Sequence, residues 1–419
     1  MGSLVVLLQF GDHYFGYDHW SDFSIEFRRK LLDPSHEMFF DHSRYESYND
    51  YWHSLAPMFP FLVALVSLVF QDIFTASVYL ALFASLMAIV YIRKFSKEIL
   101  NLNDESTYCL LAIYCSSLLV AHFFMVPIPL SFTAWFGIMS LYHSLAYFKQ
   151  PTVKAGMKIM LVFTMMMFCR EILWSMIIIP LGILVLIAIR QRFRGFTNPY
   201  HFWNNFAFLF LVSIVIPITV YGSYFLAADL WGALDESYLK LKVYGHKSII
   251  IFLYGLFLVL TINWVFFGRD AFRDIKVGMQ WVRMMGKARN HNDELEPVSP
   301  EGSNGINEIR KQEHLGNKAL QGDINDSAIM EVFFRQKMVH PFLNAWLLFF
   351  VASRILLPGG LYAMYYLPVA WIFSWKAFQG MKLVSTPTFE KIFFLALVAC
   401  TIINIFQVFP MQPFHGFFT

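Results

Sequence analysis

The chain has 419 residues, of which 57% are hydrophobic and only 15% are charged, and its formal net charge at pH 7 is +3. A soluble domain carries roughly 25% charged residues. Together with a mean hydropathy of +0.51, this composition excludes soluble enzymes, disordered scaffolds and disulfide-rich secreted domains. It predicts a protein whose solvent is the lipid bilayer. No Lys/Arg stripe alternates with exposed aromatic residues, so nucleic acid is not an expected partner.

The first elements lie in residues 1–72. Residues 1–10 are apolar, but ten helical residues rise only roughly 15 Å, so we interpret them as a short or incomplete first membrane helix. Residues 11–72 are predicted to be an outer loop with interfacial helices. The first of these is indicated by Trp20, Phe23, Phe27 and Leu31, which recur at helical spacing before Asp33-Pro34 ends the run.

The apolar run Leu55–Phe70 allows two interpretations. It is short for a membrane span and carries Pro57 and Pro60 in its first turns. We interpret it as a second interfacial element that dips into the outer leaflet. In the alternative layout this run crosses the membrane, residues 1–10 do not, and residues 11–53 are cytoplasmic. Charge alone does not reject that alternative.

The rest of the chain predicts an all-α, polytopic transmembrane helix bundle of about 10–11 spans. Residues 73–267 form a membrane helix bundle, 268–340 a flexible cytoplasmic loop without apolar periodicity, and 341–419 the C-terminal membrane helices. The apolar runs long enough to span are 73–92, 107–124, 128–147, 155–169, 172–189, 203–227, 248–267, 341–357, 361–378 and 391–410.

The distribution of basic residues predicts the orientation. If Leu55–Phe70 does not span, about two thirds of the 32 lysines and arginines fall on one side of the membrane. That side is cytoplasmic by the positive-inside rule, and residues 11–53 then face the lumen or periplasm. We therefore expect a multi-pass membrane protein of the cell inner membrane or the endoplasmic reticulum membrane. The loops on the basic side are 93–106, 148–154, 190–202, 268–340 and 376–391.

Ionisable residues are densest just after residue 10. Asp12 lies nearest the predicted membrane edge, where a partly desolvated carboxylate can act as a general base or bind a metal. Asp18 and His13 are candidates for binding a sugar or acceptor. Capping of the interfacial helix explains Asp18 equally well, and ordinary interfacial hydrogen bonding explains His13.

Further polar residues occur on the same predicted side. Tyr45 and Tyr48 belong to a polar patch that fits either a sugar site or a solvated loop. Arg170, followed by Glu171, interrupts two apolar helices. Its guanidinium can hold a lipid phosphate, or the two residues can form a local pair that marks a turn. Arg354, Lys240 and Lys242 can also reach an anionic head group, although snorkelling explains the lysines equally well.

The order of these features resembles the GT-C class of membrane glycosyltransferases, which includes protein O-mannosyltransferases, aminoarabinose transferases and the catalytic oligosaccharyltransferase subunit. The resemblance covers residues 8–195. It rests on Asp12 after the first helix, an interfacial Tyr-rich stretch, Leu55-Ala56-Pro57-Met58-Phe59-Pro60, and the Cys169-Arg170-Glu171 turn. It implies that Asp12 is the catalytic or metal-associated acid of an inverting hexosyltransferase. It also implies a polyprenyl- or dolichyl-phosphate-linked sugar as the donor.

One departure from the class concerns the metal. The class often carries a second acid in the next outer loop, but residues 121–129 contain none. This disfavours a divalent metal, leaves no cofactor certain, and favours transfer assisted by Asp12 alone. The competing hypothesis is a transporter or lipid flippase, which would need mid-span charge and repeat symmetry; Lys158 is the mid-span charge that we identify. A membrane acyltransferase or polymer ligase is a third hypothesis, with His122, His143 and His201 as its candidate residues.

Overall fold

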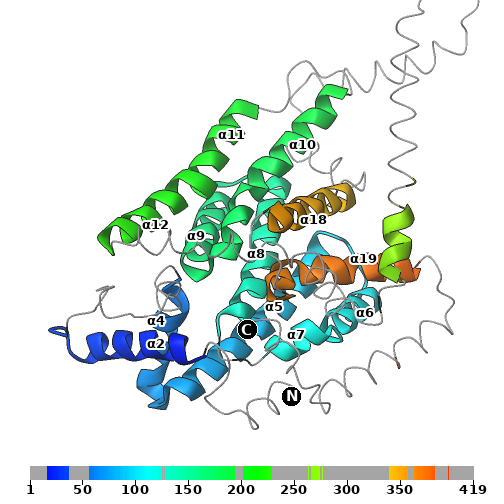
Figure 1. Ribbon diagram of the computed structural model, residues 1–419. Helices are drawn as coiled ribbons and strands as arrows, with labels where there is room; N and C mark the ends of the chain where they lie inside the picture. The colour runs from blue at the N-terminus through cyan, green and yellow to red at the C-terminus, as the bar shows by residue number, and fades with distance from the viewer. Residues whose placement is uncertain are drawn as a thin grey trace, which may run out of the picture.

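The computed structural model describes residues 17–36, 56–124, 126, 128–193, 202–228, 263, 266–273, 276, 339–356, 363–382 and 395. Within these residues every regular element is a helix, as the composition predicts (Figure 1). The α-helices are α2 (Tyr17–Leu32), α4 (Met58–Phe70), α5 (Ile73–Glu98), α6 (Asp104–Cys115), α7 (Leu118–Phe123), α8 (Leu130–Lys149), α9 (Val153–Cys169), α10 (Ile179–Phe193), α11 (Phe202–Phe210), α12 (Ile216–Ala227), α18 (Val339–Leu356) and α19 (Ala370–Lys382). The 3-10 helices η2 (Glu171–Ile178) and η6 (Ala363–Val369), the π-helical η3 (Leu211–Val215) and a helical stretch at 266–273 complete the set.

The central helix is α8, whose side chains are buried on nearly every face. A helix that is surrounded on all sides must satisfy its own polar groups. The hydroxyl of Ser140 donates to the carbonyl of Gly137 at 2.9 Å, and that of Ser144 donates to the carbonyl of Ser140 at 2.7 Å. These hydroxyls are therefore buried without needing partners from another helix.

Helix α5 runs parallel to α8. Phe83 packs on Trp135 with ring centroids 5.6 Å apart, and Lys149 Nζ, at the end of α8, donates to the carbonyl of Glu98 at 3.0 Å. Because the contacts advance in the same direction along both helices, their last residues lie at the same end of the bundle. We call this the basic end, since it carries Arg93, Lys94, Lys97, Lys149 and Lys154.

Helix α9 returns from the basic end, and α11 starts again beside it. Tyr147 of α8 stacks on Phe208 of α11 at 5.9 Å, and its hydroxyl donates to Asn205 Oδ1 at 3.1 Å. At the far side Phe168, near the end of α9, packs against Tyr224 of α12 at 5.5 Å. The first residues of α5 and α8 and the last residues of α9 and α12 thus share one end, which we call the opposite end.

Three helices in the described part of the chain are long and apolar enough to cross a membrane. They are Ile73–Glu98, Ile172–Ile189 and Phe202–Ala227, and they match the predicted spans 73–92, 172–189 and 203–227. The chain is thus a helical protein with the features of a multi-span membrane protein. Helix α4, with 13 residues, rises about 20 Å and is too short to cross the hydrocarbon core unaided.

The exposed surfaces of these helices are apolar. On α9 exposed apolar side chains recur every four residues, at Val153, Met157, Leu161 and Met165, with relative exposures between 41% and 70%, and the exposed Lys154 and Lys158 lie beside them near the basic end. A helix in water would present polar residues along such a stripe, so this surface fits contact with lipid.

Aromatic residues mark the two edges of the apolar band. Trp203, which is 76% exposed, lies at the basic end of α11, and Tyr224 lies near the opposite end of α12. At 1.5 Å per residue they are about 31 Å apart along the helix axis, which matches the thickness of the hydrocarbon core. Trp and Tyr are enriched at both membrane interfaces, so this spacing agrees with a helix that crosses the bilayer.

The structure differs from the sequence prediction at the expected span 107–124, which is broken into α6 and α7. The hydroxyl of Ser116 donates to the carbonyl of Ile113 at 2.8 Å, and the hydroxyl of Ser117 caps α7 by accepting from the N–H of Val120. These hydroxyls bond to nearby backbone groups and so stop one helix and start the next. The prediction of a continuous helix there was wrong.

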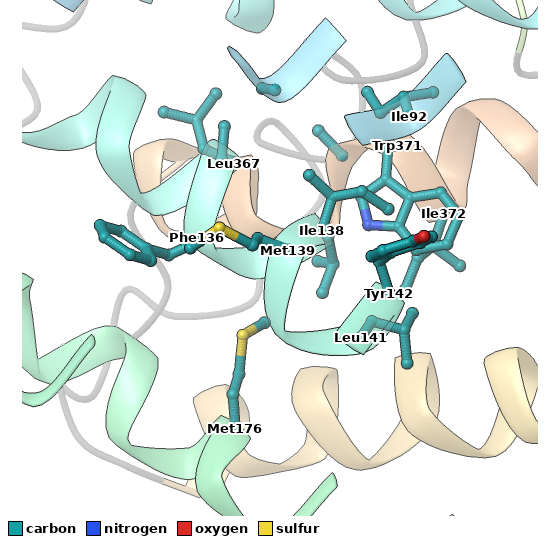
Figure 2. Close-up of a cluster of buried hydrophobic side chains, with 14 of the residues drawn as sticks. Ile92, Phe136, Ile138, Met139, Leu141, Tyr142, Met176, Leu367, Trp371 and Ile372 are labelled. Carbon is teal, nitrogen blue, oxygen red and sulfur yellow. The ribbon is translucent and has the colours of Figure 1, made fainter. Parts of the chain in front are cut away.

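A buried apolar core joins α8 to the C-terminal helices. Figure 2 shows side chains from α5, α8, η2, η6 and α19 gathered in this core. The approach of η6 is especially close, because a Cβ placed on Gly137 would lie 2.4 Å from the carbonyl oxygen of Pro368. Only a residue without a side chain allows the two backbones to touch there.

Replacing Gly137 with alanine should therefore push η6 away from α8. We expect the free energy of unfolding to fall by about 1–3 kcal/mol, as in other overpacked cores. Gly182→Ala on α10 is the matched control, because a Cβ at Gly182 meets nothing within 4 Å. The stability of both variants is measured by heating samples in detergent and using size-exclusion chromatography to determine how much monodisperse protein remains at each temperature. Equal thermal stability of the two variants would contradict this description of the contact.

Candidate functional site

The opposite end of the bundle is covered by α2 and α4. On α2, Phe23 and Ser24 are buried, and Phe27 packs edge-on against Phe61 of α4 with centroids 5.8 Å apart. Leu32, at the end of α2, is instead 66% exposed. The predicted helix ending before Asp33-Pro34 thus forms, and α4 covers part of its apolar face.

Polar contacts tie α2 to the beginning of α5. Arg28 Nη1 donates to the carbonyl of Gln71 at 3.3 Å, and Gln71 adopts a left-handed conformation with φ 61° that reverses the chain after α4. Asp72 then caps α5 by accepting from the N–H groups of Phe74 and Thr75 at 3.4 and 2.6 Å. Because α5 begins here and ends among the basic residues, α2 lies at the end away from them.

The environment of Asp72 favours its charged form. Burial works against the charge, but the hydrogen bonds from Thr75 and Phe74 and the charge of Arg28 outweigh it. They hold the pKa of the Asp72 carboxyl below its ordinary value of 3.8. Asp72 therefore serves as the cap of α5 and as a partner for α2.

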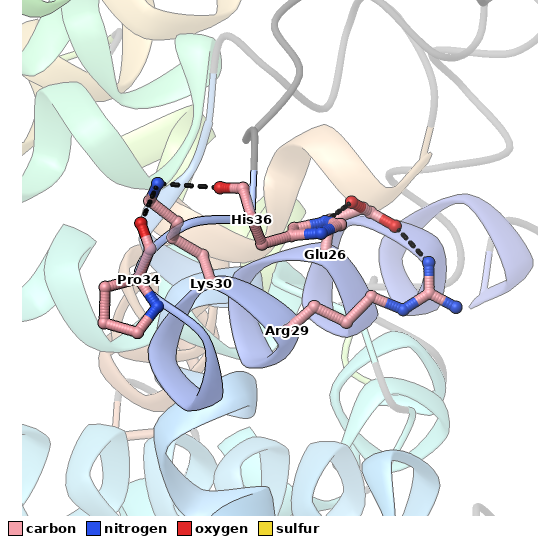
Figure 3. A network of polar contacts seen from close by, with 5 residues as sticks. All are labelled: Glu26, Arg29, Lys30, Pro34 and His36. Atoms are coloured by element: carbon pink, nitrogen blue, oxygen red, sulfur yellow. Dashed lines mark hydrogen bonds and ion pairs between the residues drawn. The ribbon is translucent and has the colours of Figure 1, made fainter.

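A polar network connects the last turns of α2 to the residues that follow the helix (Figure 3). Arg29 Nη1 and His36 Nε2 lie 2.6 and 2.7 Å from the two carboxylate oxygens of Glu26. Lys30 Nζ donates to the carbonyls of Pro34 and His36, both at 2.7 Å. The cation satisfies carbonyls beyond the helix end and folds the following chain back over α2.

Arg170 lies in a break between two apolar helices at the same end. Helix α9 ends at Cys169, Arg170 is extended with φ −164° and ψ 141°, and η2 begins at the next residue. Its side chain is half-buried, between the fully buried Cys169 and Ile172. Since α4 also contacts α9, the guanidinium is at the end covered by α2 and α4. An arginine there is suited to hold a phosphate through paired N–H donors.

Aromatic side chains surround this break. Tyr221 of α12 packs against both Phe168 and Trp174 with centroids 5.3 Å apart in each case, and Trp174 Nε1 donates to the carbonyl of Met167 at 3.1 Å. Amphipathic rings of this kind favour the boundary between hydrocarbon and water. They agree with a membrane-edge position for Arg170.

The structure describes only some of the predicted site residues. Arg170 has a described side chain, while Asp18 and Arg354 are placed only as members of α2 and α18. Asp18 and Arg170 thus belong to elements at the same end of the bundle. The candidates that lie outside the described residues are Asp12, His13, Tyr45, Tyr48, Lys240 and Lys242. Among the described residues, no three His, Cys, Asp or Glu side chains are grouped to hold a metal ion.

Sequence reasoning missed a buried ionic network formed by α19, α18 and the helix at 266–273. Lys376 Nζ lies 2.8 Å from Asp270 Oδ2 and donates to Asn344 Oδ1 at 2.7 Å. Arg273 Nη2 lies 2.5 Å from Asp270 Oδ1. Asp270 and Lys376 are 2% and 6% exposed, although the sequence assigned Asp270 to a loop and Lys376 to the boundary where the span 361–378 meets the loop 376–391. The signal for Lys376 was its position inside the run Trp371–Phe378, which is otherwise almost entirely apolar.

No protein-family model matches the chain, and no curated protein or solved structure matches it significantly.

The Asp270–Lys376 pair should be important for stability. Lys376→Met leaves the buried Asp270 carboxylate with the half-exposed Arg273 as its remaining partner among the described residues, and we expect the free energy of unfolding to fall by several kcal/mol, on the order of 3. The double variant Lys376→Met/Asp270→Asn removes both charges and should recover much of that loss. Thermal unfolding in detergent compares the two. A double variant less stable than Lys376→Met would contradict the assigned pairing.

Asp72 gives a prediction about pH. Because its pKa is lowered by folding, its contribution is complete above pH 3.8 and is lost as the pH falls further. Asp72→Ala should cost about 1 kcal/mol at neutral pH, as the loss of a helix cap does, and should remove this part of the acid sensitivity. Asp72→Asn keeps a capping oxygen and is the control. Melting curves from pH 7 to pH 3 measure the effect, and an Asp72→Ala variant that keeps the full acid sensitivity contradicts it.

Proposed function

We propose that this chain is an integral membrane glycosyltransferase that moves a sugar from a polyprenyl-phosphate carrier to an acceptor at the opposite end of the bundle. The observation that carries the proposal is the arrangement at that end. The short helix α4 and the helix α2 cover the start of α5, and the half-buried Arg170 lies in a helix break at the same end. This combination offers a membrane-edge surface with a cation suited to a lipid-linked phosphate.

Charge supports an outward-facing site. The exposed Arg93 and Lys94 lie at the basic end of α5, while Arg28 joins α2 to the residues just before α5 begins. With the basic end in the cytoplasm, α2 faces the lumen or periplasm. Asp12 precedes α2 closely in the sequence, so the proposal assigns it to the same side.

The proposed reaction is a direct displacement. A hydroxyl or amine of the acceptor attacks the anomeric carbon, and Asp12 takes the proton from the attacking group. The bond between the anomeric carbon and the phosphate oxygen breaks with inversion, and the lipid phosphate leaves with that electron pair. Arg170, assisted by Arg354, stabilises the charge on the leaving phosphate.

The second candidate is a transporter or lipid flippase, and the buried Asp270–Lys376 pair favours it. Ionisable residues inside a membrane bundle often mark an ion or substrate path. In this case the pair would serve transport, and Asp12 would have no chemical role. Sealed proteoliposomes separate the candidates, because a transporter moves its substrate across the bilayer unchanged whereas a transferase consumes the donor.

The test uses the full-length protein in membranes with a panel of radiolabelled polyprenyl-phosphate sugars. Asp12→Asn should lower donor turnover by about 10²–10⁴-fold through loss of the general base, and Arg170→Gln should also lower it. The matched controls Asp33→Asn and Arg29→Gln change exposed residues of the same two types and should keep turnover. Near-normal turnover in Asp12→Asn, with normal membrane levels of all variants, would overturn the assignment.

A further inference from the structure

A half-buried polar site lies on α8 near the basic end, in the part of the bundle where α8 packs against both α5 and α9. His143 of α8 is partly exposed there, and its Nε2 lies 3.3 Å from the hydroxyl of Tyr91 on α5. The two rings are 5.8 Å apart in an edge-on arrangement. An imidazole and a phenol, both partly exposed, therefore lie side by side at the surface of the bundle, and we call the surface around them the opening.

Two lysines flank this opening. Lys94 of α5 and Lys158 of α9 are both exposed, and both lie within electrostatic reach of the His143 ring. Lys94 Nζ lies 4.8 Å from the centre of the Tyr142 ring. Glu98, a carboxylate on the same helix, accepts the hydroxyl of Tyr142 at 2.5 Å. Within the described part of the chain neither lysine forms an ion pair, so the opening is positively charged.

Apolar side chains continue from both lysines toward the middle of the bundle. On α5, Val90 and Phe83 lie on the same face as Lys94 and are 52% and 49% exposed. On α9, Leu161 and Met165 lie on the same face as Lys158 and are 55% and 41% exposed. The charged opening is thus at the end of two exposed apolar tracks. A soluble anion would make no favourable contact with these apolar tracks, whereas the acyl chains of a lipid would pack along them.

We propose that this opening binds the phosphate of an anionic phospholipid from the leaflet at the basic end. The phosphate oxygens lie between the ammonium groups of Lys94 and Lys158 and accept a hydrogen bond from the Tyr91 hydroxyl, whose oxygen accepts in turn from His143 Nε2. The acyl chains follow the tracks of Val90 and Leu161. Basic pockets between membrane helices on the cytoplasmic side bind anionic head groups by this chemistry.

The proposal does not depend on the proposed function. The site faces the leaflet away from α2 and Arg170, and its residues take no part in the transfer reaction. Lys158 was the ionisable residue within a predicted span, and a bound phosphate gives that charge a partner.

The experiment measures lipid binding to the purified full-length protein in detergent by native mass spectrometry. Phosphatidylglycerol is compared with phosphatidylcholine for the original protein, Lys94→Gln, Lys158→Gln and the double variant. We expect about a fivefold loss of phosphatidylglycerol affinity for each lysine and little change for phosphatidylcholine. Arg93→Gln is the matched control. It removes one positive charge next to Lys94 in the sequence, but the charge of Arg93 acts on Asp104 and not on His143.

Three outcomes would overturn the proposal. The first is a double variant that binds phosphatidylglycerol as well as the original protein. The second is an equal loss of affinity in Arg93→Gln, which indicates attraction by total charge alone. The third is displacement of the lipid by millimolar inorganic phosphate, which assigns the opening to a soluble anion. Retention of the lipid in excess inorganic phosphate, with loss in the lysine variants only, supports it.

Discussion

The parallel packing of α5 on α8 sets the two ends of this molecule. Parallel neighbours require a return segment between them, and α6 and α7 occupy that part of the sequence. Because both helices finish at the same end, their terminal cations Lys97 and Lys149 gather there. All other placements follow from this, since α9 and α11 begin at the basic end and α2 is fixed to the first residues of α5.

This separation of charge gives the two ends different chemistry. At the opposite end, α2 and α4 add a layer of amphipathic helix, and Arg170 lies at a break in the helical backbone. At the basic end, Lys94 and Lys158 flank a polar opening on the lipid-facing surface. A bilayer that surrounds the apolar band between them would meet head groups at both sites, and the lysines and arginines at the end of α5 and α8 are of the kind that the cytoplasmic side favours.

The sequence predicted local features well. The boundaries of the helices at 172–189 and 203–227 follow from continuous apolar runs, and the end of α2 follows from Asp33-Pro34, because each depends only on neighbouring residues. The break at Ser116-Ser117 was missed, since hydropathy does not register hydroxyls that bond to their own backbone. The burial of Lys376 was missed because its partner Asp270 is distant in sequence, and apolar periodicity gives no pairing between separate segments.

An ionisable residue in this bundle has a structural role when other residues of the protein satisfy its charge. It is a candidate binding residue when they do not. The carboxylate of Asp72 is satisfied by backbone donors of the helix that it caps, and the ammonium of Lys376 by a carboxylate and an amide oxygen. Neither charge needs a ligand. Lys158 is exposed among apolar side chains, and no described residue supplies an anion to it. The cost of holding a charge beside hydrocarbon is lowered most by a counter-charge at the same depth, which a lipid phosphate supplies.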